Sequence, residues 1–181
     1  MLECIYAEGK VIVGYGAASG RNRLQEIGGT IHAQKRHFEH LGLPMHRYFC
    51  GTLNVDIKPL EFLPLCSKLT LLNVKWHPSR AAENFSFFDV TIHFEELHCD
   101  ALVYLPHPET KVGFEEQFPP MTTLEILAPR IEGIRTGSRL AIEAAFGSIR
   151  FEPYRAGDVR HYSAHGSLAF VEQQPATQTK S

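Results

Sequence analysis

The sequence predicts an all-β-dominated fold, a small closed β-barrel with one principal α-helix. Many short segments alternate apolar and polar residues, as half-buried strands do. Prolines and glycines separate these segments, for example at residues 106–108, 119–120 and 137–138. Only one stretch has the pattern of a good helix. Many short strands with a single helix are typical of a small barrel rather than of a parallel α/β sheet.

The clearest strand is predicted at residues 86–95, SFFDVTIHFE. From Phe88 to Glu95, apolar and polar residues alternate with a strict period of two. The other predicted strands, in chain order, cover residues 10–14, 53–57, 69–75, 101–105, 123–127, 140–145, 148–152 and 167–172.

The one helix is predicted at residues 31–41, IHAQKRHFEHL. Thr30 precedes it and is the expected N-cap, because a threonine hydroxyl can accept a hydrogen bond from the first turn. Gly42 is the expected C′ residue, since glycine adopts the left-handed conformation that ends many helices.

The length of 181 residues indicates one domain, residues 1–172, with a C-terminal extension from about residue 146. The last nine residues, QQPATQTKS at 173–181, are polar and predict a disordered tail. The extension carries Phe151, Tyr154, Tyr162 and Phe170. These aromatic side chains could fill the mouth of a pocket or form the contact of a homo-oligomer.

The charge and the cysteine pattern indicate a cytoplasmic protein with neither a nucleic-acid nor a membrane partner. The net charge is only −2, and the basic residues near positions 21–36 are interpreted as helix-surface charges. No apolar run approaches the roughly 20 residues of a membrane span, and the N-terminus does not have the pattern of a signal peptide. The four cysteines are scattered without a CxxC pair, which fits reduced thiols.

A glycine-rich stretch, GYGAASG at residues 14–20, follows the first predicted strand. Its small residues would let the backbone approach a ligand, and successive N–H groups can form an anion-binding nest. The residues concerned are Gly14, Gly16, Ala17, Ala18 and Gly20. It is neither a Walker A loop nor a convincing dinucleotide motif. On these residues alone, a turn between strands is the favoured interpretation.

The segment CGTLNVDI, residues 50–57, places Thr52 and Asn54 two residues apart behind Gly51. In a strand, both side chains would share one face. Two neutral oxygen ligands on one face could hold a cation or a phosphate. They could equally form the solvated side of an ordinary strand, and the residues alone leave both interpretations open.

The segment LEILAPR, residues 124–130, places Glu125 among apolar residues near the end of a strand. Such a carboxylate could act as a general base. An outward-facing glutamate is the alternative, and these residues alone favour it. The ten histidines show no spacing of a metal site, so solvated histidines are expected.

Read together, these segments resemble the archaeal-type CTP-dependent riboflavin kinases. That family has a glycine-rich first loop, a helix and turn of the form YxxQFxxxLGFxPYPGTLNV, and a later region of the form LEIIAPxxLRxxLxLxDGDxVxV. The corresponding segments here are GYGAASG at 14–20, IHAQKRHFEHLGLPMHRYFCGTLNVDI at 31–57 and LEILAPR at 124–130. The segment PHPETK at 106–111 looks like the family's short Pro-Arg-Thr stretch.

The resemblance implies a six-stranded cradle-loop barrel that transfers a phosphoryl group from CTP to the ribityl 5′-hydroxyl of riboflavin, giving FMN. It implies that Thr52 and Asn54 coordinate Mg²⁺ or another divalent cation, and that Glu125 accepts the hydroxyl proton. It also implies that the nucleotide is bound by Gly51, by a hydroxyl from Thr110 and by the loop that contains Gly14, Gly16, Ala17, Ala18 and Gly20.

The sequence also departs from the family pattern. Cys50 replaces the proline before GTLN, and RIEGIRTGSRL stands in place of the LR pair and the DGD turn. Arg130 and Arg135 are the candidates to replace the missing arginine. A second hypothesis follows from these departures, namely a non-kinase barrel of the same fold that binds a small ligand or a nucleotide.

Overall fold

A computed structural model describes residues 3–14, 29–107, 121–155, 160–162 and 168–170 of the chain. The helices are α1 (Thr30–His40) and the short 3₁₀ helix η1 (Met45–Arg47). The strands are β1 (Cys4–Ile12), β2 (Leu53–Asp56), β3 (Leu60–Pro64), β4 (Leu69–Val74), β5 (Glu83–Phe94), β6 (Leu97–Pro106), β7 (Thr123–Leu127), β8 (Arg139–Ala145), β9 (Ile149–Pro153), β10 (Arg160–Tyr162) and β11 (Leu168–Phe170).

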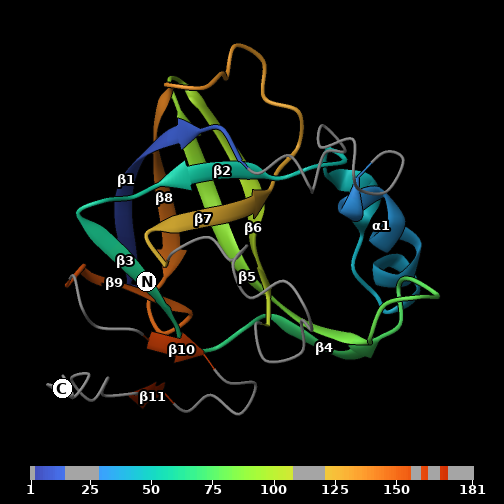
Figure 1. Ribbon diagram of the computed structural model, residues 1–181. Helices are drawn as coiled ribbons and strands as arrows, with labels where there is room; N and C mark the ends of the chain where they lie inside the picture. Colours follow the sequence, from blue (N-terminus) through green and yellow to red (C-terminus); the bar gives the residue numbers. More distant parts are fainter. Residues whose placement is uncertain (1–2, 15–28, 108–120, 156–159, 163–167, 171–181) are drawn as a thin grey trace, which may run out of the picture.

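Six of these strands close into a ring in the order β5-β6-β7-β2-β1-β8 (Figure 1). The ring closes because β5 pairs with β8 as well as with β6, and every pairing around it is antiparallel. Because the ring is closed, each of the six strands pairs with a neighbour on both sides over at least part of its length. The prediction of an all-β-dominated fold with one principal α-helix is confirmed.

The interior of the ring is filled by alternate residues of its strands, as strict period-two patterns require. On β5, Phe88, Val90 and Ile92 point inward, while Thr91 and His93 lie on the outer face. We call this interior cluster the ring core. Its buried members are Ala7, Val11, Val55, Ile57, Phe62, Phe88, Val90, Ile92, Phe94, Ala101, Val103, Leu124, Ile126, Ala128, Leu140, Ile142, Ala144 and Ile149.

A second cluster, the helix core, lies between α1 and the outside of the ring (Figure 1). Phe87 belongs to the helix core although Phe88 belongs to the ring core, so β5 is buried on both faces at this point. The buried members of the helix core are Ile31, Phe38, Leu43, Met45, Leu71, Val74, Trp76, Phe85, Phe87, Leu102, Tyr104 and Leu127.

Helix α1 ends in a Schellman motif. Leu43 donates its N–H to the carbonyl of Phe38 at 2.9 Å, and Gly42 donates to Glu39 at 3.1 Å. Gly42 has φ +96°, so the prediction of Gly42 as the C′ residue is confirmed. The expected N-cap is wrong, because Gly29 occupies that position and Thr30 is the first helical residue. No side chain caps this end in the described structure.

Sequence periodicity located most strands but missed those without alternation. Strand β7 has the predicted bounds, and the other predicted ranges each overlap a strand. Residues 4–9 of β1 and the whole of β3 and β10 were not predicted. In β3, four consecutive residues from Glu61 to Pro64 are buried, so its pattern is not that of a half-exposed strand. The predicted tail, residues 173–181, lies outside the described residues.

On the outer face of the ring, Glu143 of β8 accepts hydrogen bonds from side chains of two neighbouring strands. The His93 Nε2 atom lies 2.7 Å from Glu143 Oε2, and both side chains are about one-quarter exposed, at 27% and 24%. Hydrogen bonds from Cys4 and His93, and a weaker one from Tyr6, hold the pKa of Glu143 below its ordinary value.

This lowered pKa predicts a specific acid sensitivity. A carboxyl with a depressed pKa in the folded state contributes stability above its unfolded pKa and loses that contribution as the pH falls through the folded value. Between about pH 5 and pH 3, the free energy of unfolding should therefore fall less steeply in Glu143→Gln than in the wild type. Urea titrations at several pH values measure these slopes. Glu96→Gln, at an exposed turn, is the control, and equal slopes for Glu143→Gln and wild type would contradict the prediction.

Candidate functional site

The strand register brings together two of the residues that the sequence singled out. Asn54 of β2 and Glu125 of β7 are direct cross-strand partners. Side chains in such a pair have Cβ atoms about 4.5–5.5 Å apart and point to the same face. Their neighbours Val55 and Leu124 belong to the ring core, so Asn54 and Glu125 lie on the outer face. Both side chains are partly buried.

Thr52 joins this pair from the turn that precedes β2. Asn54 Nδ2 donates to both the Oγ1 atom and the backbone carbonyl of Thr52, each at 3.4 Å. The predicted ligand residues therefore contact one another directly. Because the two ends of a carboxamide have the same shape, a half-turn of the Asn54 amide would place Oδ1 beside Thr52 Oγ1.

Gly14 packs directly against the amide of Asn54. A Cβ atom at position 14 would lie 2.3 Å from Asn54 Nδ2 and 2.7 Å from its Cγ, both far too close. Gly14 follows β1, whose Ile12 is paired with Asn54. Glycine is therefore needed at position 14 because the Asn54 amide occupies the space of a Cβ atom, and not because the chain must turn there.

The pair of Thr52 and Asn54 fits a magnesium ion better than a transition metal. Mg²⁺ prefers oxygen ligands and binds through one or two protein groups, with water and substrate phosphates completing its shell. The hydroxyl and the turned amide supply two such oxygens, and Glu125 lies across from them. Within the described ranges, no three His, Cys, Asp or Glu residues form a metal cluster.

Tyr104 and Gln34 connect this polar group to α1. Tyr104 Oη donates a hydrogen bond to Gln34 Oε1 at 3.1 Å, and both residues are buried. Burial raises the pKa of Tyr104 well above its ordinary value, and the negative charge of Glu125 raises it further. Glu125 is therefore electrostatically coupled to a tyrosine that stays neutral and acts as a hydrogen-bond donor. Neither Tyr104 nor Gln34 was singled out from the sequence.

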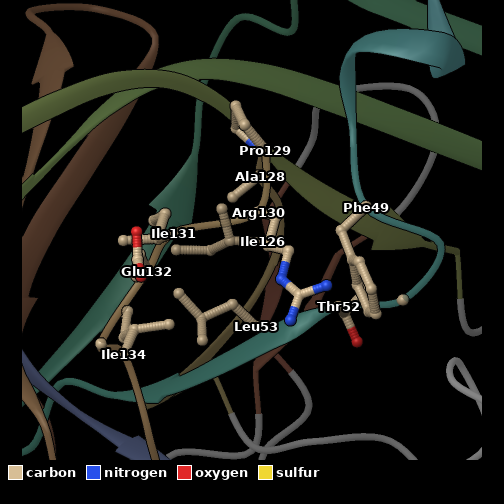
Figure 2. A pocket seen from close by; sticks show the side chains of 12 residues that line it. Phe49, Thr52, Leu53, Ile126, Ala128, Pro129, Arg130, Ile131, Glu132 and Ile134 are labelled. Carbon is tan, nitrogen blue, oxygen red and sulfur yellow. The ribbon is translucent and has the colours of Figure 1, made fainter.

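An open pocket of about 830 Å³ lies at the end of the ring beside Thr52 (Figure 2). Apolar side chains form much of its wall, and the polar side chains in the wall are those of Thr52, Arg130 and Glu132. The full lining is Phe49, Gly51, Thr52, Leu53, Ile126, Ala128, Pro129, Arg130, Ile131, Glu132, Gly133 and Ile134. Thr52 thus belongs both to the polar group on the outer face and to the pocket.

The segment that follows β7 forms one wall of this pocket. Residues 129–134 follow β7 directly and contribute Arg130, Ile131 and Ile134. Gly51, a predicted nucleotide-binding residue, is buried and also lines the pocket. Arg135 does not line it, so of the two arginines considered from the sequence, Arg130 is the one at the pocket.

The remaining residues predicted to bind the nucleotide lie outside the described part of the chain. These are Gly16, Ala17, Ala18, Gly20 and Thr110. Cys50, which stands where the related motif has proline, has its Sγ 3.9 Å from His32 Nδ1 of α1.

The fold and the site define an all-β protein, a closed ring of six strands with one α-helix packed outside it and a polar group beside an open pocket. No protein-family model and no curated protein matches the sequence. Within the described residues, neither α1 nor η1 has the length and apolar character that a membrane-crossing helix needs.

Proposed function

We propose that the protein is a phosphotransferase of the riboflavin-kinase type, which transfers a phosphoryl group from CTP to the ribityl 5′-hydroxyl of riboflavin and forms FMN. The observation that carries this proposal is the register of β2 and β7. It sets the Glu125 carboxylate opposite Asn54, with Thr52 Oγ1 3.4 Å from the Asn54 amide and the pocket beginning at Thr52. A base, two oxygen ligands and a pocket are the parts that this reaction needs.

Glu125 is the general base in this proposal. The acceptor hydroxyl oxygen forms a bond to the terminal phosphorus of CTP, and the bond from that phosphorus to the bridging oxygen of CDP breaks. The hydroxyl proton passes to a Glu125 carboxylate oxygen and afterwards to water. Burial and the negative charge of Glu125 raise the pKa of Tyr104, so Tyr104 stays neutral and adds no competing negative charge.

Thr52 and Asn54 are the residues that would hold Mg²⁺, which supplies neutralisation of the phosphate charge when bound. Two neutral protein ligands suffice because the triphosphate brings most of the negative charge. Gly14 keeps the Asn54 amide in position, since any side chain there would overlap it. The apolar wall of the pocket, with Leu53, Ile131 and Ile134, gives a planar ring a surface to bury.

The test is FMN formation by the purified full-length protein. Riboflavin and Mg²⁺ are incubated with CTP or with ATP, and FMN is separated by chromatography. We expect FMN with CTP, and a loss of at least about 100-fold in the initial rate for Thr52→Ala or Asn54→Ala. Thr136→Ala, at an exposed turn, is the matched control. Absence of FMN with either nucleotide, from protein shown to be folded, would refute the proposal and leave a ligand-binding protein without transfer.

The close approach of Gly14 gives a second prediction. Gly14→Ala should weaken binding of Mg²⁺–CTP by about 10-fold or more, because the new methyl group displaces the Asn54 amide. Stability should change little, since the displaced group is the end of a flexible side chain. Calorimetric titration of Gly14→Ala, Asn54→Ala and the double variant measures the coupling. Additive effects of the two substitutions would show that Gly14 does not act through Asn54.

A further inference from the structure

We propose that Gln34 and Tyr104 are positioning residues for Glu125, in which Gln34 accepts the hydrogen bond of the Tyr104 hydroxyl and so keeps that hydroxyl from donating to the Glu125 carboxylate. The effect is to preserve the capacity of Glu125 to take a proton. This inference rests on the proposed function, because Glu125 is the base there. Gln34 and Tyr104 act through Glu125 and are assigned no contact with the substrate.

Tyr104 lies beside Glu125 on the outer face of the ring. Val103 of β6 is paired with Ile126 of β7. One further step of the same antiparallel register sets Tyr104 next to Glu125, and Glu125 is in turn the partner of Asn54 on β2. Burial raises the pKa of Tyr104 and the charge of Glu125 raises it further, so the two side chains are close enough to interact.

The Tyr104 hydroxyl gives its hydrogen to Gln34. Tyr104 Oη donates to Gln34 Oε1 at 3.1 Å. The two residues are only 5% and 2% exposed, so bulk water does not compete for this bond. A phenolic hydroxyl has a single hydrogen to donate. The Glu125 carboxylate therefore does not receive it.

Both partners of this bond are fixed by packing. The ring of Tyr104 stacks on Phe85 at a centroid distance of 5.7 Å and an angle of 19°, and it meets Phe87 at 6.0 Å. Gln34 lies on the buried face of α1 together with Phe38, which is fully buried in the helix core. Because neither side chain can swing away, the main remaining freedom of the hydroxyl is the direction of its O–H bond.

The choice of acceptor matters for proton transfer. A hydrogen bond donated to a carboxylate stabilises its charged form and makes it a weaker base. A glutamine is suited to hold the hydroxyl elsewhere, since its amide oxygen accepts the bond and carries no charge that changes with pH. Without that oxygen, the buried Tyr104 hydroxyl would lose its partner, which is costly. It would then turn toward the neighbouring carboxylate of Glu125.

The experiment follows the titration of Glu125 in the full-length protein by NMR of the glutamate side-chain carboxyl carbons, with no turnover required. The Glu125 signal is assigned as the one that Glu125→Gln removes. In Gln34→Leu, the midpoint of this titration should move to lower pH by about 0.5–1 unit. In Tyr104→Phe it should stay within about 0.3 unit of the wild type, because the competing donor is gone.

The double variant Gln34→Leu/Tyr104→Phe separates this effect from a displacement of α1. It should return the Glu125 midpoint to the wild-type value, since no hydroxyl is left to donate. His40→Leu, at an exposed position of the same helix, is the matched control. Thermal unfolding of each variant verifies the fold. If Gln34→Leu does not fold, Gln34→Met keeps an unbranched side chain and carries the same expectation.

The pH dependence of FMN formation gives the functional measurement. In Gln34→Leu, the acidic limb of kcat should move to lower pH by the same amount as the Glu125 titration, because a weaker base loses its proton at lower pH. The plateau of kcat should fall about 3- to 10-fold, with the KM values for riboflavin and CTP within about 2-fold. A merely structural role of Gln34 would not move the acidic limb.

Two outcomes overturn the inference. One is an unchanged Glu125 titration in Gln34→Leu, and the other is a shift that persists in the double variant. The inference and the proposed function fail separately. A Glu125 titration that responds to Gln34 as expected, in a protein that forms no FMN, would reject the kinase and keep the control of Glu125 by Gln34. FMN formation with the same acidic limb and the same Glu125 titration in Gln34→Leu and wild type would keep the kinase and reject that control.

Discussion

Replacing Phe38 with alanine should lower the free energy of unfolding by about 3–5 kcal/mol. Phe38 is fully buried, at 0% exposure, in the centre of the helix core. Its ring meets Phe85 edge-on at a centroid distance of 5.0 Å and Phe87 at 5.3 Å. The substitution removes these contacts and leaves a cavity that the surrounding aromatic rings cannot fill without moving.

Urea denaturation followed by circular dichroism measures this loss. Leu41→Ala at the end of the same helix is the control, because Leu41 is 48% exposed and should change the free energy of unfolding by about 0.5 kcal/mol or less. A loss below about 1 kcal/mol for Phe38→Ala would mean that α1 contributes little to the folded state. The same variant should also perturb the site, since Gln34 lies one turn before Phe38 and bonds to Tyr104.

The sequence allowed prediction of the strands that have one buried face. Residues 88–95 alternate because one face meets the ring core and the other is exposed or partly exposed. Strand β7 was predicted although four of its five residues are buried. Strand β3 escaped prediction because its apolar Phe62 and Leu63 are adjacent and it ends in Pro64, a residue that argues against a strand. The helix was predicted from its pattern, but the predicted N-cap, Thr30, is one residue too late in the chain. Gly29 occupies the cap position, without a side-chain hydrogen bond.

The candidate site could be predicted only in its separate parts. Thr52 and Asn54 are two residues apart, so their shared face follows from strand geometry. The meeting of Asn54 with Glu125 depends on the register between β2 and β7, which the sequence does not specify without the fold. Gly14 next to Asn54 likewise depends on the pairing of β1 with β2.

The sequence next to the other residues of this site does not indicate that they belong to it. Gln34 and Tyr104 are 70 positions apart and meet only because α1 packs over β6. Arg130 and Arg135 are equivalent candidates in the sequence, and only the path of residues 129–134 along the pocket separates them. Side chains that converge through long-range packing have no spacing rule from which they could be predicted.

Replacing Glu125 with glutamine should lower kcat for FMN formation by about 100- to 10,000-fold, which is the usual contribution of a general base. Glutamine keeps the size of the side chain and removes its capacity to accept the proton. The substitution should leave Mg²⁺–CTP binding within a few-fold, because Thr52 and Asn54 are unchanged. The loss is therefore expected in kcat, with little change in the affinity for the donor.

Single-turnover and steady-state assays of FMN formation, together with calorimetric titration of CTP, separate these two effects. Glu39→Gln, on the exposed face of α1, is the matched control and should retain wild-type kcat. If Glu125→Gln keeps kcat within about 3-fold, Glu125 is not the base and its pairing with Asn54 is structural. If it instead abolishes CTP binding, Glu125 acts on the bound cation or donor. A pH–rate profile distinguishes these roles further, because the acidic limb of kcat should disappear only when the lost group is the base.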